Sequence, residues 1–175
     1  MAADVFVAPS ASVVGEVLML NEVSVWYGAV VRGDKNKVKV GHCSSIQDKA
    51  IVNTVSSLPS GYAADVQIGD FVSIDKGAII TSSVIGNGVQ VGAGAIVQEG
   101  CVVEDGSIVA PGAVVQAGTL IKKGQFWAGN PATYVRDVDE SESKMFEKNA
   151  AVTYETAREH IDEYVGEFGT AYRNL

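Results

Sequence analysis

The feature of this sequence that most constrains its fold is a six-residue repeat. From Ile85 onward a large apolar residue returns at every sixth position, and the eight residues of this series are Ile85, Val91, Val97, Val103, Val109, Val115, Ile121 and Trp127. Because successive side chains of a strand point to opposite faces, an even period brings the same face inward in every repeat. Short strands that stack on the next turn at this period are typical of the hexapeptide β-helix.

Glycine marks the corners of the predicted coil. A glycine follows each of the first seven apolar positions by three residues, and the seven are Gly88, Gly94, Gly100, Gly106, Gly112, Gly118 and Gly124. Glycine adopts positive φ at little steric cost, so we expect positive φ at these positions. The residues two positions before the apolar series are mostly small, which predicts a second inward-facing position in each repeat.

The same period extends toward the N-terminus with three interruptions. The earlier members of the series are Val7, Val13, Met19, Val25, Val31, Val40, Ile46, Val52, Ile68, Ile74 and Ile80. The interruptions are residues 32–37, residues 53–67, and the loss of one residue between Ile80 and Ile85. We expect the first two to be loops that leave the coil at its corners. At about 18 residues per turn, the coil has about seven turns.

The C-terminal part has a different pattern. Residues 1–132 are predicted to form the β-helix domain with the loop 53–67, and residues 133–175 a linker and an α-helix. Acids at and after Asp139 are typical of a helix N-terminus. The apolar residues that recur at roughly helical spacing are Met145, Phe146, Ala150, Val152, Tyr154, Ala157, Ile161, Tyr164 and Phe168. We expect the face of Met145, Phe146, Tyr154 and Ile161 to pack on the coil.

Composition excludes several classes of function. The chain has 13 basic and 21 acidic residues, and a net charge of −8 argues against nucleic acid as a partner. No apolar run approaches the ~20 residues of a transmembrane segment. The two cysteines, Cys43 and Cys101, do not indicate a disulfide scaffold. Met1 to Ser10 has the composition of neither a presequence nor a secretory signal, so none is expected in a primary translation product.

Few residues are candidates for chemistry. The two histidines, His42 and His160, are too few for a three-ligand zinc centre in one chain. The remaining polar residues gather around the interruptions: Arg32, Asp34, Gln47, Asp48, Asn53, Lys76 and Thr81. Arginine is well suited to bidentate pairing with carboxylates, including across interfaces, so we expect the Arg32 and Asp34 pair to be structural.

Four motifs resemble the γ-class carbonic anhydrases. They are VWYGAVVRGD at residues 25–34, VG at residues 40–41, IQD at residues 46–48 and WAGNPA at residues 127–132, and the likeness extends over nearly the whole chain. The resemblance implies a left-handed parallel β-helix with three strands per turn, assembled as a trimer. It also implies that Arg32, Asp34, Gln47 and Asp48 serve subunit contacts and position groups around a metal site.

The sequence departs from this family at the metal ligands. The family binds zinc with three histidines at each interface, two from one subunit and one from its neighbour. The resemblance places them at Asn53, Lys76 and Thr81, where this chain has no histidine. A protonated lysine places positive charge where the cation would sit, and without zinc no bound water has its pKa lowered to ~7. We therefore expect an inactive homologue with no catalytic residue, no metal and no cofactor.

Within the family, the resemblance is strongest to the γ-carbonic-anhydrase-like subunits of mitochondrial respiratory complex I (NADH:ubiquinone oxidoreductase). It implies a structural subunit in a heterotrimer with related γ-carbonic anhydrase subunits. That trimer would contact membrane-arm subunits on the matrix side of the inner membrane, and this chain would have no transmembrane segment of its own. Lys76 is expected either to supply the cation in the vacated pocket, paired with a carboxylate, or to point to solvent.

Two alternatives remain open. One is a soluble homotrimeric enzyme, either a degenerate anhydrase or a hexapeptide acyltransferase with His42 as its base near a coenzyme A groove. The other is a scaffold like the β-helix proteins of the dynactin pointed end. The native mass would separate these alternatives, because the complex I subunit belongs to a large membrane assembly and the enzyme to a small trimer.

Overall fold

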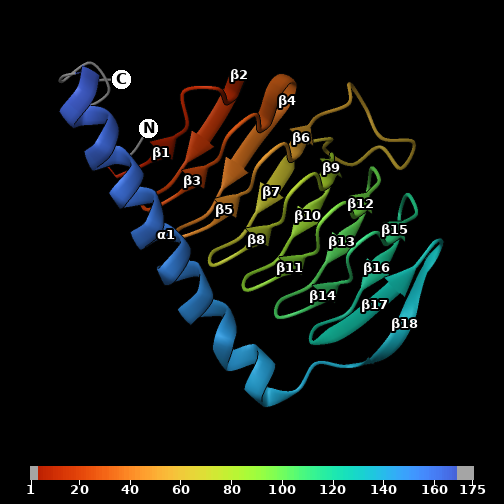
Figure 1. Ribbon diagram of the computed structural model, residues 1–175. Helices are drawn as coiled ribbons and strands as arrows, with labels where there is room; N and C mark the ends of the chain where they lie inside the picture. The colour runs from red at the N-terminus through yellow and green to blue at the C-terminus, as the bar shows by residue number, and fades with distance from the viewer. Residues whose placement is uncertain (1–3, 169–175) are drawn as a thin grey trace.

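The chain is a parallel β-solenoid of about seven turns with one long helix along its side (Figure 1). The computed structural model describes residues 4–168, with the side chains of residues 4–163. Figure 1 shows the strands stacked as successive rungs, from the N-terminal turns at one end to the last hairpin at the other. The prediction of an all-β solenoid with a C-terminal α-helix is confirmed.

The strands form three walls. The first wall contains β1 (Phe6–Val7), β3 (Ser24–Val25), β5 (Ser45–Ile46), β8 (Ser73–Ile74), β11 (Gln90–Val91), β14 (Ile108–Val109) and β17 (Gln125–Gly129). The second contains β6 (Ile51–Asn53), β9 (Ile79–Thr81), β12 (Ile96–Val97) and β15 (Val114–Val115). The third contains β7 (Val66–Ile68), β10 (Val84–Ile85), β13 (Val102–Val103) and β16 (Leu120–Ile121). The long strands β2 (Ser12–Met19) and β4 (Val30–Val40) each span the second and third walls.

The six-residue series forms the core. Its members pair in register between consecutive turns, as Val91 does with Val109 and Val97 with Val115. From Met19 to Ile121 the members of the series are buried, so one continuous apolar stack runs through the coil. Only the members at the two ends, such as Val13 and Trp127, are partly exposed. Side chains alternate between the two faces of a strand, and each six-residue repeat contains one corner, so a residue that recurs every six positions points inward in every repeat.

The predicted corners are confirmed. All seven glycines of the regular series have positive φ, between 63° and 73°. A different glycine is required by close approach: a Cβ on Gly86 would lie 2.4 Å from Asp105 Oδ1. That carboxylate accepts a hydrogen bond of 2.8 Å from the backbone N–H of Asn87. In the next two turns toward the N-terminus, Asn87 Oδ1 accepts the equivalent bond from the backbone N–H of Asp70, and Asp70 Oδ1 accepts one from that of His42. A ladder of polar side chains therefore connects the turns at this corner.

The two long interruptions have different structures. Residues 54–65 form the expected loop between β6 and β7, anchored by the buried side chain of Leu58. The expected loop at residues 32–37 is wrong, because these residues belong to β4. Gly33 pairs with Gly15 and Val38 with Val17, so the extra residues of β4 bulge outward from an otherwise continuous strand pair.

The expected linker after residue 132 is also wrong at its start. Residues Ala132–Asp137 form β18, which pairs antiparallel with β17 across the cis peptide bond Asn130–Pro131. The hairpin gives β17 a partner on the side that would otherwise be an open sheet edge. Helix α1 (Glu140–Phe168) follows directly, and residues 169–175 of the predicted C-terminal region lie outside the described residues.

Helix α1 begins at a capped turn. The carboxylate of Glu142 accepts a hydrogen bond of 2.9 Å from the backbone N–H of Asp139, in the manner of a capping box. The guanidinium of Arg136 donates two hydrogen bonds, of 2.7 and 2.8 Å, to the same carboxylate. The bonds from Arg136, with that from Asp139, lower the pKa of Glu142 to about 2. Arg136 also lies over the ring of Phe126, so it connects the end of the coil to the helix.

The helix packs on the coil along one stripe, as expected, with one error. Phe146 is buried, and Tyr154 and Ile161 are half-buried. Met145 is 46% exposed, because it lies one residue, or about 100° of helix rotation, away from Phe146. Ala150 and Ala157, which are buried, complete the stripe. The side chains of Tyr164 and Phe168 lie outside the described residues.

The last described turns of α1 rest on the first turns of the coil. Ala157 is buried against an aromatic cluster of Phe6 and Trp26, and the Tyr27 hydroxyl lies 2.8 Å from His160 Nδ1. Within the described part of the chain, no helix is long and apolar enough to cross a membrane.

Candidate functional site

The second wall brings three of the predicted site residues into one row. Arg32 on β4 pairs in register with Asn53 on β6, and Asn53 pairs with Thr81 on β9. Each follows a buried core residue, so their side chains leave the outer face of the wall. The resemblance placed metal ligands at Asn53 and Thr81, and these two residues are adjacent on neighbouring strands.

An apolar row runs beside this polar row. It consists of β-branched residues that pair in register across five successive turns and are half-buried: Val30, Ile51, Ile79, Ile96 and Val114. We call these five residues the apolar row of the second wall. A continuous apolar stripe on a flat outer sheet face, beside polar residues, has the character of an association surface.

Asn53 has an unsatisfied acceptor. Among the described residues, Asn53 Oδ1 is the one buried side-chain nitrogen or oxygen without a hydrogen-bond partner. Its in-register neighbour Arg32 donates instead to Asp34, at 2.7 Å, and this bond lowers the pKa of the Asp34 carboxyl. Leaving a buried acceptor unpaired costs about 1–3 kcal/mol, so this amide is a local cost to the stability of the second wall.

Three of the other predicted residues lie at the corner between the first and second walls, whereas Asp34 lies on β4 beside Arg32. Lys76 Nζ lies 3.6 Å from Asp48 Oδ2, and 72% of the Lys76 side chain is exposed. The turns stack closely here, because the backbone N–H of Gly77 donates to the Asp48 carbonyl at 3.0 Å. Gln47 points along the first wall, where its Nε2 lies 3.4 Å from Ser45 Oγ. The structure therefore separates the corner group of Gln47, Asp48 and Lys76 from the row on the second wall.

The sequence analysis missed a half-buried carboxyl beside this corner. Ser73 Oγ donates a hydrogen bond of 2.8 Å to Asp75 Oδ1, and burial raises the pKa of Asp75. Ser45 lies one turn above, with its Oγ 3.5 Å from that of Ser73. The sequence contains a pattern that could have identified this carboxyl. In three successive turns a serine precedes the core residue of the first wall, and a larger side chain follows that core residue.

The donor set does not suit zinc. The three positions offer an amide, an ammonium and a hydroxyl, whereas zinc in proteins is held by cysteine, histidine and carboxylate side chains. Within residues 4–168, no group of three or more His, Cys, Asp or Glu side chains is arranged to hold a metal ion. His42 lies at another corner, with Nε2 3.4 Å from Glu22 Oε2, and His160 lies on α1.

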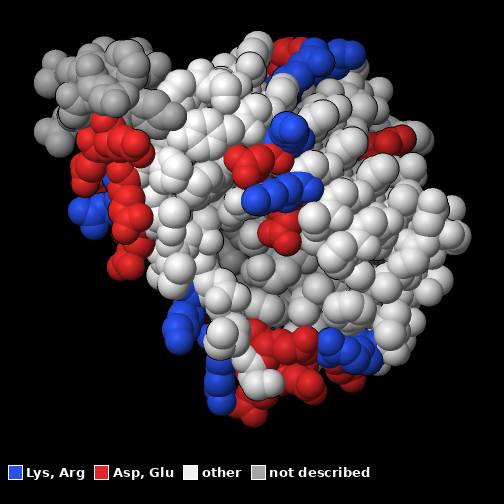
Figure 2. All heavy atoms as spheres, viewed as in Figure 1, with Lys and Arg blue, Asp and Glu red and all other residues white. Residues whose placement is uncertain are grey.

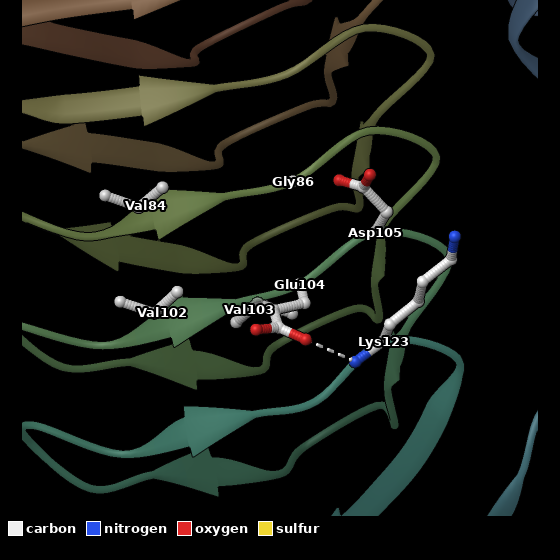
Figure 3. Close-up of a pocket in the computed structure, with 7 residues that line it drawn as sticks. All are labelled: Val84, Gly86, Val102, Val103, Glu104, Asp105 and Lys123. Carbon is white, nitrogen blue, oxygen red and sulfur yellow. Dashed lines mark hydrogen bonds between the residues drawn. The ribbon is translucent and has the colours of Figure 1, made fainter.

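A hollow of about 250 Å³ lies on the third wall, away from these residues (Figure 3). Its lining consists of Val84, Gly86, Val102, Val103, Glu104, Asp105 and Lys123. Figure 3 shows Glu104 turned toward the backbone of Lys123, whose N–H donates to Glu104 Oε2 at 2.9 Å. None of the predicted site residues lines this hollow.

The charged side chains are unevenly distributed over the surface (Figure 2). Figure 2 shows acidic side chains along the edge formed by α1, and a broad surface of uncharged residues over the coil. The exposed acids of the helix are Glu140, Glu147, Glu155, Glu159, Asp162 and Glu163. The helix therefore presents an acidic face on the side turned away from the coil.

Comparison with known proteins adds independent observations. Residues 82–117 match the family model "Bacterial transferase hexapeptide (six repeats)". "Gamma carbonic anhydrase-like 1, mitochondrial" of Arabidopsis thaliana is 44% identical over 98% of this chain and 68% of its own length. "Probable carbonic anhydrase" of Methanocaldococcus jannaschii is 43% identical over 92% of this chain and 97% of its own.

A solved structure has the same architecture. The "hexapeptide transferase family protein from Anaplasma phagocytophilum" superposes with a TM-score of 0.82 and is 35% identical, with 90% of this chain and 89% of that chain covered. Against four further Arabidopsis thaliana relatives, this chain spans 58 to 64% of their length.

Proposed function

Because this chain belongs to the γ-carbonic anhydrase family, we propose that it is a non-catalytic, structural subunit of a γ-carbonic anhydrase trimer in mitochondrial complex I. The trimer would lie on the matrix side of the inner membrane, against subunits of the membrane arm. The word "mitochondrial" in the names of the Arabidopsis thaliana relatives supports this location. The remaining members of the trimer would be related γ-carbonic anhydrase subunits.

The observation that carries the proposal is the chemistry of the three ligand positions. Asn53 and Thr81 lie next to each other on the outer face of the second wall, where a neutral amide and a hydroxyl replace two imidazoles. Lys76, at the adjoining corner, carries a positive charge. Carbon dioxide hydration in this family needs a zinc-bound water, and these side chains offer zinc no adequate set of ligands. The proposed role is therefore structural.

The association surface supports a subunit role. The apolar row of the second wall is only half-buried in the single chain, and burial of apolar area drives most protein association. The pair of Arg32 and Asp34 lies beside this row on β4, and Asp48 lies at the adjoining corner. Positioned there, these charged groups fit the subunit contacts that the resemblance implies for them.

Native mass tests the assembly. Chain carrying a C-terminal affinity tag, expressed in its source organism, is expected to migrate with complex I in native gels of mitochondrial membranes. A matched control carries Val30→Asp and Ile79→Asp, which place charge in the apolar row, and should be lost from the complex. Recovery of the unmodified chain only as a small soluble trimer would overturn the proposal.

Zinc content tests the loss of the metal site separately. The purified chain is expected to contain no stoichiometric zinc and to show no carbonic anhydrase activity. The triple variant Asn53→His, Lys76→His and Thr81→His should gain zinc if these positions are the former ligands. Gln116→His, which adds an exposed histidine elsewhere on the second wall, is the control and should gain none. Stoichiometric zinc in the unmodified chain would contradict the assignment.

One observation favours a second candidate, a hexapeptide acyltransferase: the similar solved protein is named as a hexapeptide transferase family member. In this chain the base would be His42, whose Nε2 lies 3.4 Å from Glu22 Oε2. Equilibrium dialysis with coenzyme A separates the two candidates. Saturable binding, with acyl transfer that is lost in His42→Asn, would favour the enzyme; the structural proposal expects neither.

A further inference from the structure

Asn87 is the one asparagine of this chain that a glycine follows, and its exposed side chain lies at the corner between the third and first walls. An asparagine before glycine is prone to deamidation, because glycine has no side chain to hinder attack by its backbone nitrogen. A bond forms between Gly88 N and Asn87 Cγ, the bond from Cγ to Nδ2 breaks, and ammonia leaves with the proton of the attacking nitrogen. Water then opens the resulting succinimide ring, which gives aspartate or isoaspartate.

The stacked turns immobilise both groups that react. Asn87 Oδ1 accepts a hydrogen bond of 2.9 Å from the backbone N–H of Asp70, and the backbone N–H of Gly88 donates one of 2.8 Å to the Asp70 carbonyl. The attacking nitrogen and the amide that it attacks are therefore bound to the same residue of the preceding turn. The nitrogen must lose its proton and leave its carbonyl partner before it can bond to Cγ, so the reaction requires the two turns to separate.

Two further contacts hold this corner in place. The backbone N–H of Asn87 donates a hydrogen bond of 2.8 Å to Asp105 Oδ1 in the following turn. Figure 3 shows the Asp105 carboxylate turned toward the corner that follows Gly86. On the outer side, Phe146 of α1 lies 3.6 Å from the position of a Cβ on Gly88, so the helix packs against the same corner. Asn87 is therefore held by the turn before it, the turn after it and the helix.

The products of deamidation do not fit the ladder of polar side chains at this corner. In three successive turns the equivalent position holds Asp70, Asn87 and Asp105, so a neutral amide separates two carboxylates. Neighbouring turns are about 4.8 Å apart, so a third carboxylate between these two adds repulsion on both sides. Isoaspartate also lengthens the main chain at a corner whose length sets the register of the stack.

We propose that Asn87 is a deamidation site that the stacked turns protect, and that its conversion weakens the stacking at this corner. The amide persists while the turns stay in place. When they separate, the amide is converted, and the turns then restack less stably. The inference is independent of the proposed function, because none of Asn53, Lys76 and Thr81 lies at this corner.

Peptide mass spectrometry of the purified full-length chain tests the protection. The chain is incubated at mildly alkaline pH, either folded or in guanidinium chloride concentrated enough to unfold it, and the conversion of Asn87 is measured in its tryptic peptide. We expect conversion to be roughly tenfold faster or more in the unfolded chain, because the folded chain reacts only from its open state. Equal rates would overturn the protection, and an amide that stays intact in the unfolded chain would overturn the site.

A variant of the following turn tests which contacts protect the amide. Asp105→Ala removes the acceptor for the Asn87 N–H and should speed conversion in the folded chain roughly fivefold. Glu104→Ala is the matched control, because that carboxylate accepts a hydrogen bond from the Lys123 N–H instead, and it should leave the rate unchanged. Each variant removes one carboxylate from the same turn, so equal rates in the two would overturn the protection by the ladder.

The variant Asn87→Asp tests the consequence without any deamidation. It keeps an acceptor for the Asp70 N–H but places a charge between Asp70 and Asp105, so the urea midpoint should fall. The loss should be smaller at high salt, because screening weakens the repulsion. Gln116→Glu, which adds the same charge at an exposed position on the second wall, is the control and should change the midpoint little. A midpoint that Asn87→Asp leaves unchanged would overturn the proposed weakening.

Discussion

The two halves of the coil follow the same period with different strictness. From Ile85 to Trp127 every corner is a glycine with positive φ, and the turns stack without insertions. Before Ile85, the chain inserts residues in β4 and in the loop 54–65. Several corners there place residues other than glycine at positive φ: Glu22, Cys43, Lys49, Phe71 and Ser82. All seven predicted site residues lie in this irregular half.

The difference indicates how a solenoid accommodates function. Each turn is stabilised mainly by its neighbours, so a local departure from the period is tolerated when the turns above and below stay in register. A residue other than glycine at positive φ costs on the order of 1–2 kcal/mol. Between Ile85 and Trp127, no corner has a residue other than glycine at positive φ, whereas the irregular half has several. The irregular half is also the one that contains Asn53, Lys76 and Thr81.

The largest expected effect tests whether the two halves share one core. Ile80, in the irregular half, and Ile121, in the regular half, are both fully buried. Ile80→Ala and Ile121→Ala should each lower the free energy of unfolding by about 2–5 kcal/mol, measured by urea titration. Val14→Ala, at a half-exposed position, is the control and should change it little. If only one of the two substitutions lowered the free energy of unfolding, the two halves would unfold separately.

The corner glycines should respond next most strongly. Gly106 has φ of +66°, and no atom lies within 4 Å of the position of an added Cβ, so the backbone alone opposes substitution. Gly106→Val should lower the free energy of unfolding by about 1–3 kcal/mol in urea, because a β-branched residue resists this conformation. Gly106→Asn, which tolerates positive φ better, should cost less. Equal stability of Gly106→Val and the unmodified chain would count against the corner assignment.

In the irregular half, the opposite substitution, which introduces glycine at a corner where another residue has positive φ, should stabilise the chain. Lys49 has φ of +58° at a corner. Lys49→Gly removes the steric conflict and should raise the free energy of unfolding by roughly 0.5–1 kcal/mol, after the greater entropy of glycine in the unfolded chain is subtracted. Lys122→Gly, an exposed position without this backbone, should not stabilise. A loss of stability in Lys49→Gly would show that its side chain contributes more than its backbone costs.

The smallest effect concerns the start of the helix, which connects the regular end of the coil to its first turns. The pKa of Glu142 is about 2 in the folded chain against an ordinary value of 4.5. Because the folded pKa is the lower one, the contact stabilises the chain above pH 4.5 and loses that contribution as the pH falls toward 2. Thermal melts followed by circular dichroism should therefore depend less on pH in this window for Glu142→Gln than for the unmodified chain. Glu147→Gln, outside the capped turn, is the control and should keep the original pH dependence.

The repeating part of this protein could be predicted from the amino-acid sequence. The six-residue series specified which side chains point inward, and the glycines specified the corners. Both predictions succeed because the alternation of side-chain direction along a strand and the backbone conformation at a corner are local properties that recur in every repeat. The helix stripe was also largely predictable. Met145 was placed on the wrong side because irregular apolar spacing does not distinguish neighbouring positions on a helix as closely as packing does.

Which residues lie side by side on the outer surface depends on how the turns pack on one another, and the sequence pattern does not specify this. Asn53 pairs with Arg32 on one side and Thr81 on the other, and this alignment requires turns of unequal length to stack in register. The continuation of β4 through its extra residues, the hairpin of β18 and the unpaired Asn53 Oδ1 are likewise invisible to a periodic pattern. Such contacts join residues that are distant in the sequence, and their geometry is set by how whole turns pack on one another.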